Sequence, residues 1–314
     1  MFTHFRAQAS GRPVAAMWVG EPRMTHRLNT LASLAMAFAF CGLLSAQPLE
    51  SAAAAHDKLE SVLWVQTAAE HDAAYLQAFA TAHRMLDAAL KNKKWTAAIE
   101  QQPGFERLPP AVILDLDETI LDNSPEEAAG ILRAHSIPGA LWDEWVTQER
   151  AGALPGALDF TKYARAKGVE VFYVTNRDTK SKEATRRTLA RGGFPLRDGV
   201  ETIYCLGDMP GTGNDKGPRR AAIAKRYRVL LLLGDDLGDF LSAVRVEPEQ
   251  RRRMMGSYAS YWGERWIILP NPMYGSWVGS LYGYDAALNN GEQRQRMVKH
   301  LRSMDARTQG GIPR

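Results

Sequence analysis

Short apolar runs alternate with amphipathic stretches through the middle of the chain. Four runs have the length and apolar content of strands that are buried on both faces, at 111–116, 169–174, 202–206 and 229–233. Between them, apolar residues recur at three- and four-residue steps, which predicts helices over 157–167, 181–192 and 218–227. Because strands that alternate with helices of this length are typical of a parallel sheet flanked by helices, the pattern predicts an α/β fold.

The segments around this core are also patterned. Apolar side chains keep helical spacing from about residue 57 to 100, and a last helix is predicted over 285–305. Residues 258–284 are rich in glycine and aromatic residues. An insertion at about 124–150 follows the first strand, so we expect it above the carboxyl end of that strand, where open α/β sheets bind ligands.

The first 46 residues have the features of a secretory leader. Residues 31–44 are uncharged and apolar, Arg23 and Arg27 precede them, and the small Ser45 and Ala46 follow. As a helix this run would rise about 21 Å, which is short of the roughly 30 Å hydrocarbon core of a membrane. A buried core helix is the alternative. The pattern predicts a signal peptide and therefore a periplasmic or secreted protein.

Cysteine usage bears on the final location. Cys41 lies inside the apolar run, and its acylation would make the chain an outer-membrane lipoprotein, although bulky Phe40 just before it disfavours lipidation. Membrane attachment is therefore expected only if Cys41 is lipidated. After cleavage near Ala46 only Cys205 remains, which excludes an internal disulfide. We predict a linker at 47–56, one domain over 57–307 and a flexible tail at 308–314.

Composition and charge exclude several classes of protein. The chain is 45% hydrophobic and 24% charged, which excludes collagen-like, coiled-coil and wholly disordered chains. Lys and Arg outnumber Asp and Glu by 39 to 35, but four of the arginines and one of the acids lie in residues 1–46, so the remainder carries +1. A nucleic acid polymer is therefore not an expected partner.

Acidic residues stand at the end of the first predicted strand. Strand alternation places Asp115 and Asp117 on one side of the chain as it leaves the sheet. Two carboxylates this close need a metal ion, or one of them must hold a proton. They therefore suit a nucleophile and a proton-transfer group. A helix N-cap is the alternative, but it accounts for only one of the two acids.

Polar residues follow the later strands as well. Thr175 and Asn176 close the second strand as donors fit for phosphate, although helix capping is the preferred explanation when this motif is taken alone. Lys216 follows a Gly-rich loop and opens a helix. Asp235, Asp236 and Asp239 lie in a turn bracketed by glycine after the fourth strand, and hard oxygen ligands of this kind suit Mg²⁺. Because strand ends of a parallel sheet converge on one crevice, together these residues predict a phosphoryl-transfer site.

These residues carry a family resemblance. Residues 115–119, Thr175, Lys216 and Gly234-Asp235-Asp236 resemble, in order, the four motifs of the haloacid dehalogenase (HAD) superfamily. More narrowly, residues 114–124, 172–177, 234–240 and 269–277 resemble the class C bacterial acid phosphatases and 5′-nucleotidases. The resemblance covers residues from about 57 to 301. It implies a Rossmann-like HAD core, a small helical cap and N-terminal helices.

The resemblance also implies roles for individual residues. Asp115 would attack phosphorus, and Asp117 would protonate the leaving alcohol and then activate water. Mg²⁺ would be held by Asp115, the backbone carbonyl of Asp117 and Asp235, supported by Asp236 or Asp239. The phosphoryl oxygens would be held by Thr175, Asn176 and Lys216.

Substrate recognition follows from two aromatic residues. Trp145 and Tyr274 match positions where the family sandwiches a nucleobase, which implies nucleoside 5′-monophosphates as substrates. The alternative is that Trp145 anchors the cap and Tyr274 packs in a loop. Two other functions stay open: a phosphatase for non-nucleotide monoesters, and a surface binding protein on a HAD scaffold, for haem as an example. A homo-oligomer is compatible with the sequence.

Overall fold

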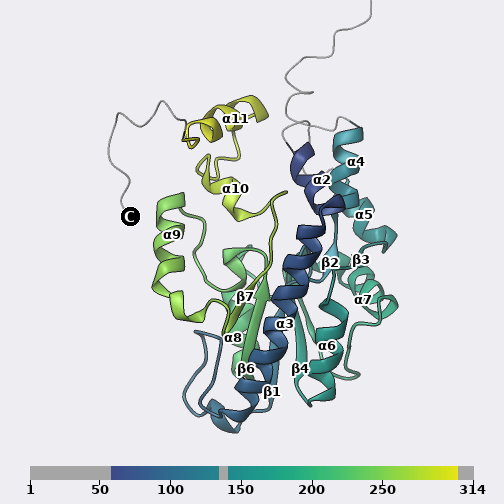
Figure 1. Ribbon diagram of the computed structural model, residues 1–314, viewed down its shortest axis with the longest axis vertical. Coiled ribbons are helices and arrows are strands. Elements are labelled where there is room, and N and C mark those ends of the chain that lie inside the picture. The colour runs from purple at the N-terminus through teal and green to yellow at the C-terminus, as the bar shows by residue number, and fades with distance from the viewer. Residues whose placement is uncertain (1–57, 134–140, 303–314) are drawn as a thin grey trace, which may run out of the picture. The chain divides into compact units, whose positions relative to one another are not determined.

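The structure is a computed structural model that describes residues 58–133 and 141–302. Its centre is a parallel sheet with the strand order β5-β4-β1-β6-β7. Figure 1 labels four of these strands, β4, β1, β6 and β7. The strands are β1 Pro110–Leu114, β4 Glu170–Asp178, β5 Ile203–Leu206, β6 Arg228–Gly234 and β7 Trp266–Ile268. The predicted α/β fold is confirmed. The edge strand β7 was not predicted, because three residues within the aromatic-rich segment are too few to show a period.

The order of the strands locates the ligand crevice. In β1, Leu114 pairs with Tyr173 of β4 on one side and with Leu233 of β6 on the other. The chain runs outward from β1 through β4 and β5, returns to β6, and then adds β7 at the other edge. The order of strands therefore reverses between β1 and β6. In open parallel sheets, ligands bind beyond the carboxyl ends of the strands at such a reversal.

Helices cover both faces of the sheet. One face packs against α3 Ala69–Lys91, α6 Ala157–Ala166 and α7 Lys182–Arg191, and α3 and α6 lie side by side (Figure 1). The other face packs against α8 Gly217–Ala224 and α9 Pro248–Ser257. Val112 of β1 faces the first layer and Ile113 the second. This alternation makes β1 apolar on both faces, as the sequence pattern predicted.

The N-terminal helical segment is shorter than predicted. It forms α2 Leu59–Thr67 and α3, with Ala68 in an extended conformation between them. The predicted helix to residue 100 is wrong beyond α3, because Asn92 is extended and the chain then runs beside β6. There Trp95 Nε1 donates to the carbonyl of Leu230 and the Ala97 N–H donates to the carbonyl of Val229, each at 2.8 Å.

The insertion after β1 is mainly helical. A two-stranded antiparallel pair, β2 Leu121–Asp122 and β3 Gly152–Ala153, lies at its base. The insertion contains α4 Ser124–Leu132 and α5 Trp142–Gln148, with residues 134–140 outside the described part.

The C-terminal helix is shorter than the predicted 285–305. It is α11 Asn290–Val298, and α10 Ser276–Ser280 precedes it. Asn289 fixes the start of α11: its side chain accepts the Glu292 N–H, and the Glu292 carboxylate accepts the Asn289 N–H. Four short 3₁₀ helices complete the described chain: η1 Phe105–Arg107, η2 Thr179–Ser181, η3 Leu237–Asp239 and η4 Ala259–Tyr261.

Several predictions concern residues outside the described part. The leader at 1–46, the linker at 47–56 and the tail at 308–314 all lie there. Among residues 58–133 and 141–302, no helix has the length and apolar content needed to cross a membrane.

Candidate active site

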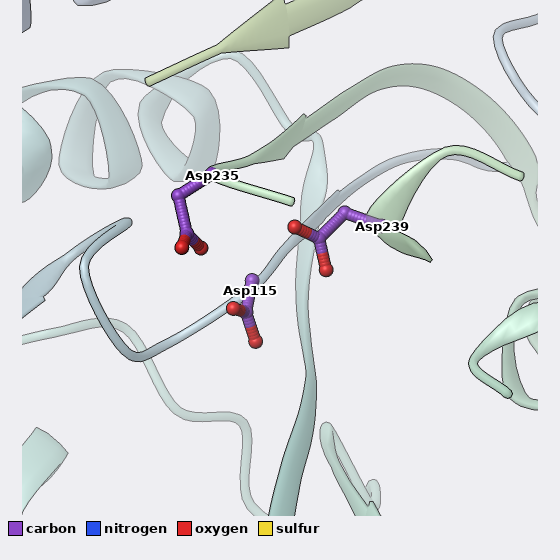
Figure 2. A group of neighbouring side chains, drawn as sticks. All are labelled: Asp115, Asp235 and Asp239. Carbon is purple, nitrogen blue, oxygen red and sulfur yellow. The ribbon is translucent and has the colours of Figure 1, made fainter. Parts of the chain in front are cut away.

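Three carboxylates meet at the reversal point of the sheet. Asp115 follows β1, Asp235 follows β6 and Asp239 closes η3. One carboxylate oxygen of each lies within 4.8 Å of the other two (Figure 2). Burial raises the pKa of all three groups, and for Asp115 it does so to about 7 although Lys216 opposes the shift. Buried like charges at this spacing require a cation between them or protons on them.

Lys216 supplies one positive charge to this acidic cluster. It stands at the start of α8, and its Nζ lies 2.6 Å from Oδ1 of Asp115 and 2.6 Å from Oδ1 of Asp239. Burial alone lowers the pKa of this ammonium group, but the two carboxylates raise it above its ordinary value. One ammonium group cannot balance three carboxylates. Hard carboxylate oxygens in this arrangement fit a divalent cation.

Two neutral donors orient Asp235. Thr119 Oγ1 donates to Oδ1 at 3.1 Å, and Asn271 Nδ2 donates to Oδ2 at 2.9 Å. The Asn271 side-chain oxygen in turn accepts the N–H of Met273 at 3.0 Å and of Tyr274 at 3.3 Å. Asn271 therefore links the loop at 269–275, between β7 and α10, to the acidic cluster. This loop carries Tyr274.

Asp236 and Asp239 have different surroundings. The Asp236 carboxylate accepts the N–H of Ser276 at 2.8 Å and its hydroxyl at 2.6 Å, so it holds the start of α10. It also caps η3 through the Gly238 N–H. Of the two acids expected to support the metal, the structure therefore places Asp239 in the cluster and uses Asp236 to fix the neighbouring backbone.

Asp117 faces a buried arginine. Arg177 donates to its Oδ1 through Nη2 at 2.7 Å and through Nε at 3.0 Å. The intervening Glu118 has a φ of 53°, in the left-handed region, and its buried carboxylate accepts the Asn123 N–H at 2.8 Å. Burial raises the pKa of Glu118, and the charges of Asp117 and Asp235 add to the effect. This turn gives Asp115 and Asp117 different partners, although they are two residues apart.

Comparisons with known proteins bear on the family of this chain. A sequence profile for the HAD superfamily, subfamily IIIB (acid phosphatase), matches residues 43–277. The chain belongs to this family. The class C acid phosphatase from Bacillus anthracis is 36% identical, with a TM-score of 0.71, over 80% of this chain and 99% of that one. Its structure with tungstate bound is 34% identical, with a TM-score of 0.70 and the same coverage.

Plant relatives match over a shorter region. Acid phosphatase 1 of Solanum lycopersicum is 28% identical over 165 residues, and the stem 28 kDa glycoprotein of Glycine max is 24% identical over 166 residues. Each match covers 52% of this chain, which spans 57% and 58% of those relatives. The family profile and the Bacillus anthracis structure confirm the resemblance seen in the sequence, to the class C acid phosphatases of the HAD superfamily.

In this acid phosphatase family member, the predicted phosphate-binding residues of β4 contact protein groups. Buried Thr175 accepts the Arg177 N–H at 3.0 Å. The Asn176 side chain donates to the carbonyl of Asn214 at 3.2 Å and accepts Arg219 Nη2 at 2.7 Å. Arg219 also donates to the carbonyl of Thr175 and so joins the Thr-Asn motif to the loop before Lys216. Phosphate binding by these residues stays a prediction.

The two predicted base-binding aromatics lie in different settings. Trp145 of α5 is only 9% exposed, and its Nε1 donates to Asn123 Oδ1 at 2.8 Å. Tyr274 is half-buried and packs on the small cluster formed by Val62, Val65 and Met273. Among the described residues its buried hydroxyl has no hydrogen-bond partner. Base stacking by both rings stays a prediction.

Sequence reasoning missed four polar residues that organise the site. They are Asn123, Arg177, Arg219 and Asn271. Three of them stand inside the segments that carried the resemblance: Asn123 in 114–124, Arg177 in 172–177 and Asn271 in 269–277. A buried carboxylate at a strand end needs donors, and this need was the one signal that could have drawn attention to them.

Proposed function

We propose that this chain is a Mg²⁺-dependent acid phosphatase that hydrolyses phosphate monoesters by transferring the phosphoryl group to Asp115. The observation that carries the proposal is the buried cluster of Asp115, Asp235 and Asp239 with Lys216. Relatives named acid phosphatases support it, as does one relative with tungstate, a tetrahedral oxyanion like phosphate.

The proposed reaction uses the two acids at the end of β1 in the roles that the family resemblance implies. A carboxylate oxygen of Asp115 attacks phosphorus, and the bond to the leaving oxygen breaks with its electron pair on that oxygen. Asp117 gives a proton to this oxygen and later takes one from the water that hydrolyses the aspartyl phosphate. Lys216 offsets negative charge beside Asp115.

The acidic residues are suited to hold the metal. Mg²⁺ would be held by the carboxylates of Asp115, Asp235 and Asp239 and by the Asp117 carbonyl that the family resemblance implies, and it would offset charge on the transferring phosphoryl group. Thr119 and Asn271, which bond Asp235, would keep that carboxylate aimed at the ion.

The decisive experiment compares esters with and without metal. Purified protein is assayed on a nucleoside 5′-monophosphate and on a sugar phosphate, with Mg²⁺ or with a chelator. We expect turnover that needs the metal and that is lost by more than about 10³-fold in Asp115→Asn, because the amide keeps the shape but is no nucleophile. Appreciable activity in a folded Asp115→Asn protein would rule out the covalent route. Tight ligand binding with no turnover would favour a binding protein.

Nucleoside 5′-monophosphates are the substrates we propose. Tyr274 lies on the loop that Asn271 ties to the acidic cluster, and Trp145 lies in the insertion that reaches Asn123 beside Asp117. Aromatic faces near a phosphate site bind any flat base. A sugar phosphate turned over as well as the nucleotide would favour the broader phosphatase for non-nucleotide monoesters.

Export and an acidic optimum complete the proposal. The apolar run at 31–44 with its arginine flank supports export to the periplasm or beyond. Because Asp117 has to carry a proton when the alcohol leaves, we propose that kcat is highest in mildly acidic solution. Cell fractionation with N-terminal sequencing tests the first statement, and a profile of kcat against pH tests the second. Unprocessed chain in the cytoplasm, or kcat rising steadily to alkaline pH, would contradict them.

A further inference from the structure

The Asp117 carboxylate is held unequally at its two oxygens. Oδ1 accepts three close donors: Arg177 Nη2 at 2.7 Å, Asn123 Nδ2 at 2.9 Å and Arg177 Nε at 3.0 Å. Oδ2 has only longer contacts, with Arg177 Nε at 3.2 Å and Thr175 Oγ1 at 3.4 Å. A carboxylate oxygen has two lone pairs, so Oδ1 is fully occupied and Oδ2 is the oxygen that stays open for proton transfer.

Arg177 cannot serve the reaction by touching the substrate. Its side chain is 1% exposed, whereas that of Asp117 is 15% exposed. Protein groups surround the guanidinium: Nη1 lies 3.4 Å from Thr185 Oγ1, and the Trp142 ring centre lies 5.5 Å from the central carbon. Any effect of Arg177 on the reaction therefore passes through Asp117.

Asn123 connects Asp117 to the insertion. It is fully buried, and its side-chain oxygen accepts Trp145 Nε1 at 2.8 Å and Arg177 Nη2 at 3.3 Å. Its amide nitrogen donates to Asp117 and, at 3.3 Å, to Glu118. The indole N–H is only a donor, so it can face only the oxygen of the amide. Trp145 thereby turns the amide nitrogen of Asn123 toward Asp117.

We propose that Arg177 and Asn123 are positioning residues that fill Oδ1 of Asp117 and leave Oδ2 directed at the leaving oxygen, with Trp145 fixing the orientation of Asn123. The inference rests on the proposed phosphatase function. As the bond between phosphorus and the leaving oxygen breaks, the proton on Oδ2 passes to that oxygen, and Asp117 is left as the carboxylate. The insertion then has a part in catalysis that is separate from base stacking.

The dependence of rate on the leaving group isolates this role. An alkoxide needs a proton when it leaves, whereas p-nitrophenolate is stable enough to leave without one. A misdirected Asp117 therefore slows alkyl phosphates and spares p-nitrophenyl phosphate. The quantity to compare is kcat/KM, because it reports only the steps up to release of the alcohol.

Three variants test the proposal in the full chain with Mg²⁺. Arg177→Lys keeps the charge but loses the bidentate hydrogen bonding of the guanidinium group. Asn123→Leu loses the amide, and Trp145→Phe keeps a ring but loses the N–H. We expect Arg177→Lys and Asn123→Leu to lower kcat/KM for an alkyl phosphate by about 10²-fold, as misplaced catalytic groups do. Trp145→Phe, which removes one hydrogen bond, is expected to cost about 10-fold. The rate on p-nitrophenyl phosphate should change little.

A matched control separates this effect from loss of stability. Trp95 Nε1 also makes a 2.8 Å hydrogen bond, to the Leu230 carbonyl, away from the acidic cluster. Trp95→Phe should leave the ratio of the two rates unchanged. Equal losses on both esters in the three variants would overturn the proposal, and if only Trp145→Phe folds, its ratio alone decides. Wild-type protein inactive on both esters would instead refute the proposed function.

Discussion

Asn271 and Asp235 are joined by a 2.9 Å hydrogen bond from the Asn271 amide to Oδ2 of the carboxylate. The bond connects a late loop to the residue that follows β6. Asn271 also accepts two backbone N–H groups, so its amide cannot rotate freely. Asp235 thus presents its carboxylate in a fixed direction, with Thr119 on its other oxygen.

This bond leads to a prediction about metal affinity. Asn271→Ala should weaken Mg²⁺ binding about 10- to 100-fold, as is typical when a group that orients a metal ligand is removed. Calorimetric titration of the metal-free protein with Mg²⁺ measures the change in affinity. Asn176→Ala, which removes an amide bonded to the Asn214 carbonyl and Arg219, is the matched control and should bind Mg²⁺ as wild type does. Equal affinity in Asn271→Ala and wild type would contradict the assignment.

The raised pKa of Asp115 leads to a prediction of how the stability of the metal-free protein depends on pH. Burial raises its pKa from an ordinary value of 3.8 to about 7, so between these values the folded chain holds a proton that the unfolded chain has lost. Stability therefore falls as the pH rises through this window. The pKa values of Asp235 and Asp239 are raised too and act with the same sign. The raised pKa of Lys216 has its effect only at more alkaline pH.

Thermal unfolding with and without Mg²⁺ measures this slope. Without metal, Tm should fall between about pH 4 and 7, and saturating Mg²⁺ should reduce the fall, because the ion stabilises the ionised carboxylates. Asp115→Asn should show a shallower slope without metal. The prediction fails if the two wild-type profiles run parallel over the whole range.

The proposed stacking of Tyr274 on the base predicts that its replacement raises KM more for nucleotides than for small esters. Replacing it with Leu should raise KM for a nucleoside 5′-monophosphate about 10-fold or more, since a stacked base contributes roughly 1–3 kcal/mol. KM for glycerol phosphate should change much less. Tyr274→Phe keeps the ring and removes only the hydroxyl that has no partner among the described residues, so it should behave as wild type.

Trp145 is expected to act in the same way on KM. Trp145→Ala removes the ring and should raise KM for the nucleotide more than for glycerol phosphate. Trp145→Phe keeps a ring, so it should leave KM for the nucleotide nearly unchanged. Equal changes on both substrates in Tyr274→Leu and Trp145→Ala would show that the two rings only support the fold.

Most of the sheet could be predicted from the sequence, because short apolar runs that alternate with amphipathic helical stretches are typical of buried parallel strands. Strand β7 could not, since Trp266–Ile268 is short and Ile268 is exposed. The ends of α3 and α11 also depended on local backbone bonds. Ala97 pairs with β6 where helical spacing suggested more helix, and the capping box of Asn289 delays the start of α11.

The arrangement of the site could be predicted only in part, because it depends on local turns as well as on the ends of the strands. Strand ends place Asp115 and Asp235 together, because they follow neighbouring parallel strands. Which acid of the next turn joins them depends on η3, where Asp236 caps the turn and Asp239 points to the cluster. The partnership of Asp117 with Arg177 depends on the left-handed turn at Glu118, which no spacing of residues reveals.

The attachment of the insertion leads to the last prediction. Glu149 follows α5, and its carboxylate lies 2.7 Å from Nε of Arg187 and 2.7 Å from Nη2 of Arg191, both on α7. The hydrogen bond from Arg187 is the main reason that the pKa of Glu149 lies below its ordinary 4.5. The ion pairs therefore persist in mildly acidic solution and are lost only as the pH falls through that lowered value.

Glu149→Gln should speed hydrogen exchange in α5 while leaving Tm nearly unchanged, because the arginines are largely exposed. High salt should do the same to the wild-type protein. Asp143→Asn, which breaks an exposed pair with Lys180, should have a smaller effect. If exchange in α5 is unchanged in Glu149→Gln at every salt concentration, contacts other than these ion pairs hold the insertion on α7.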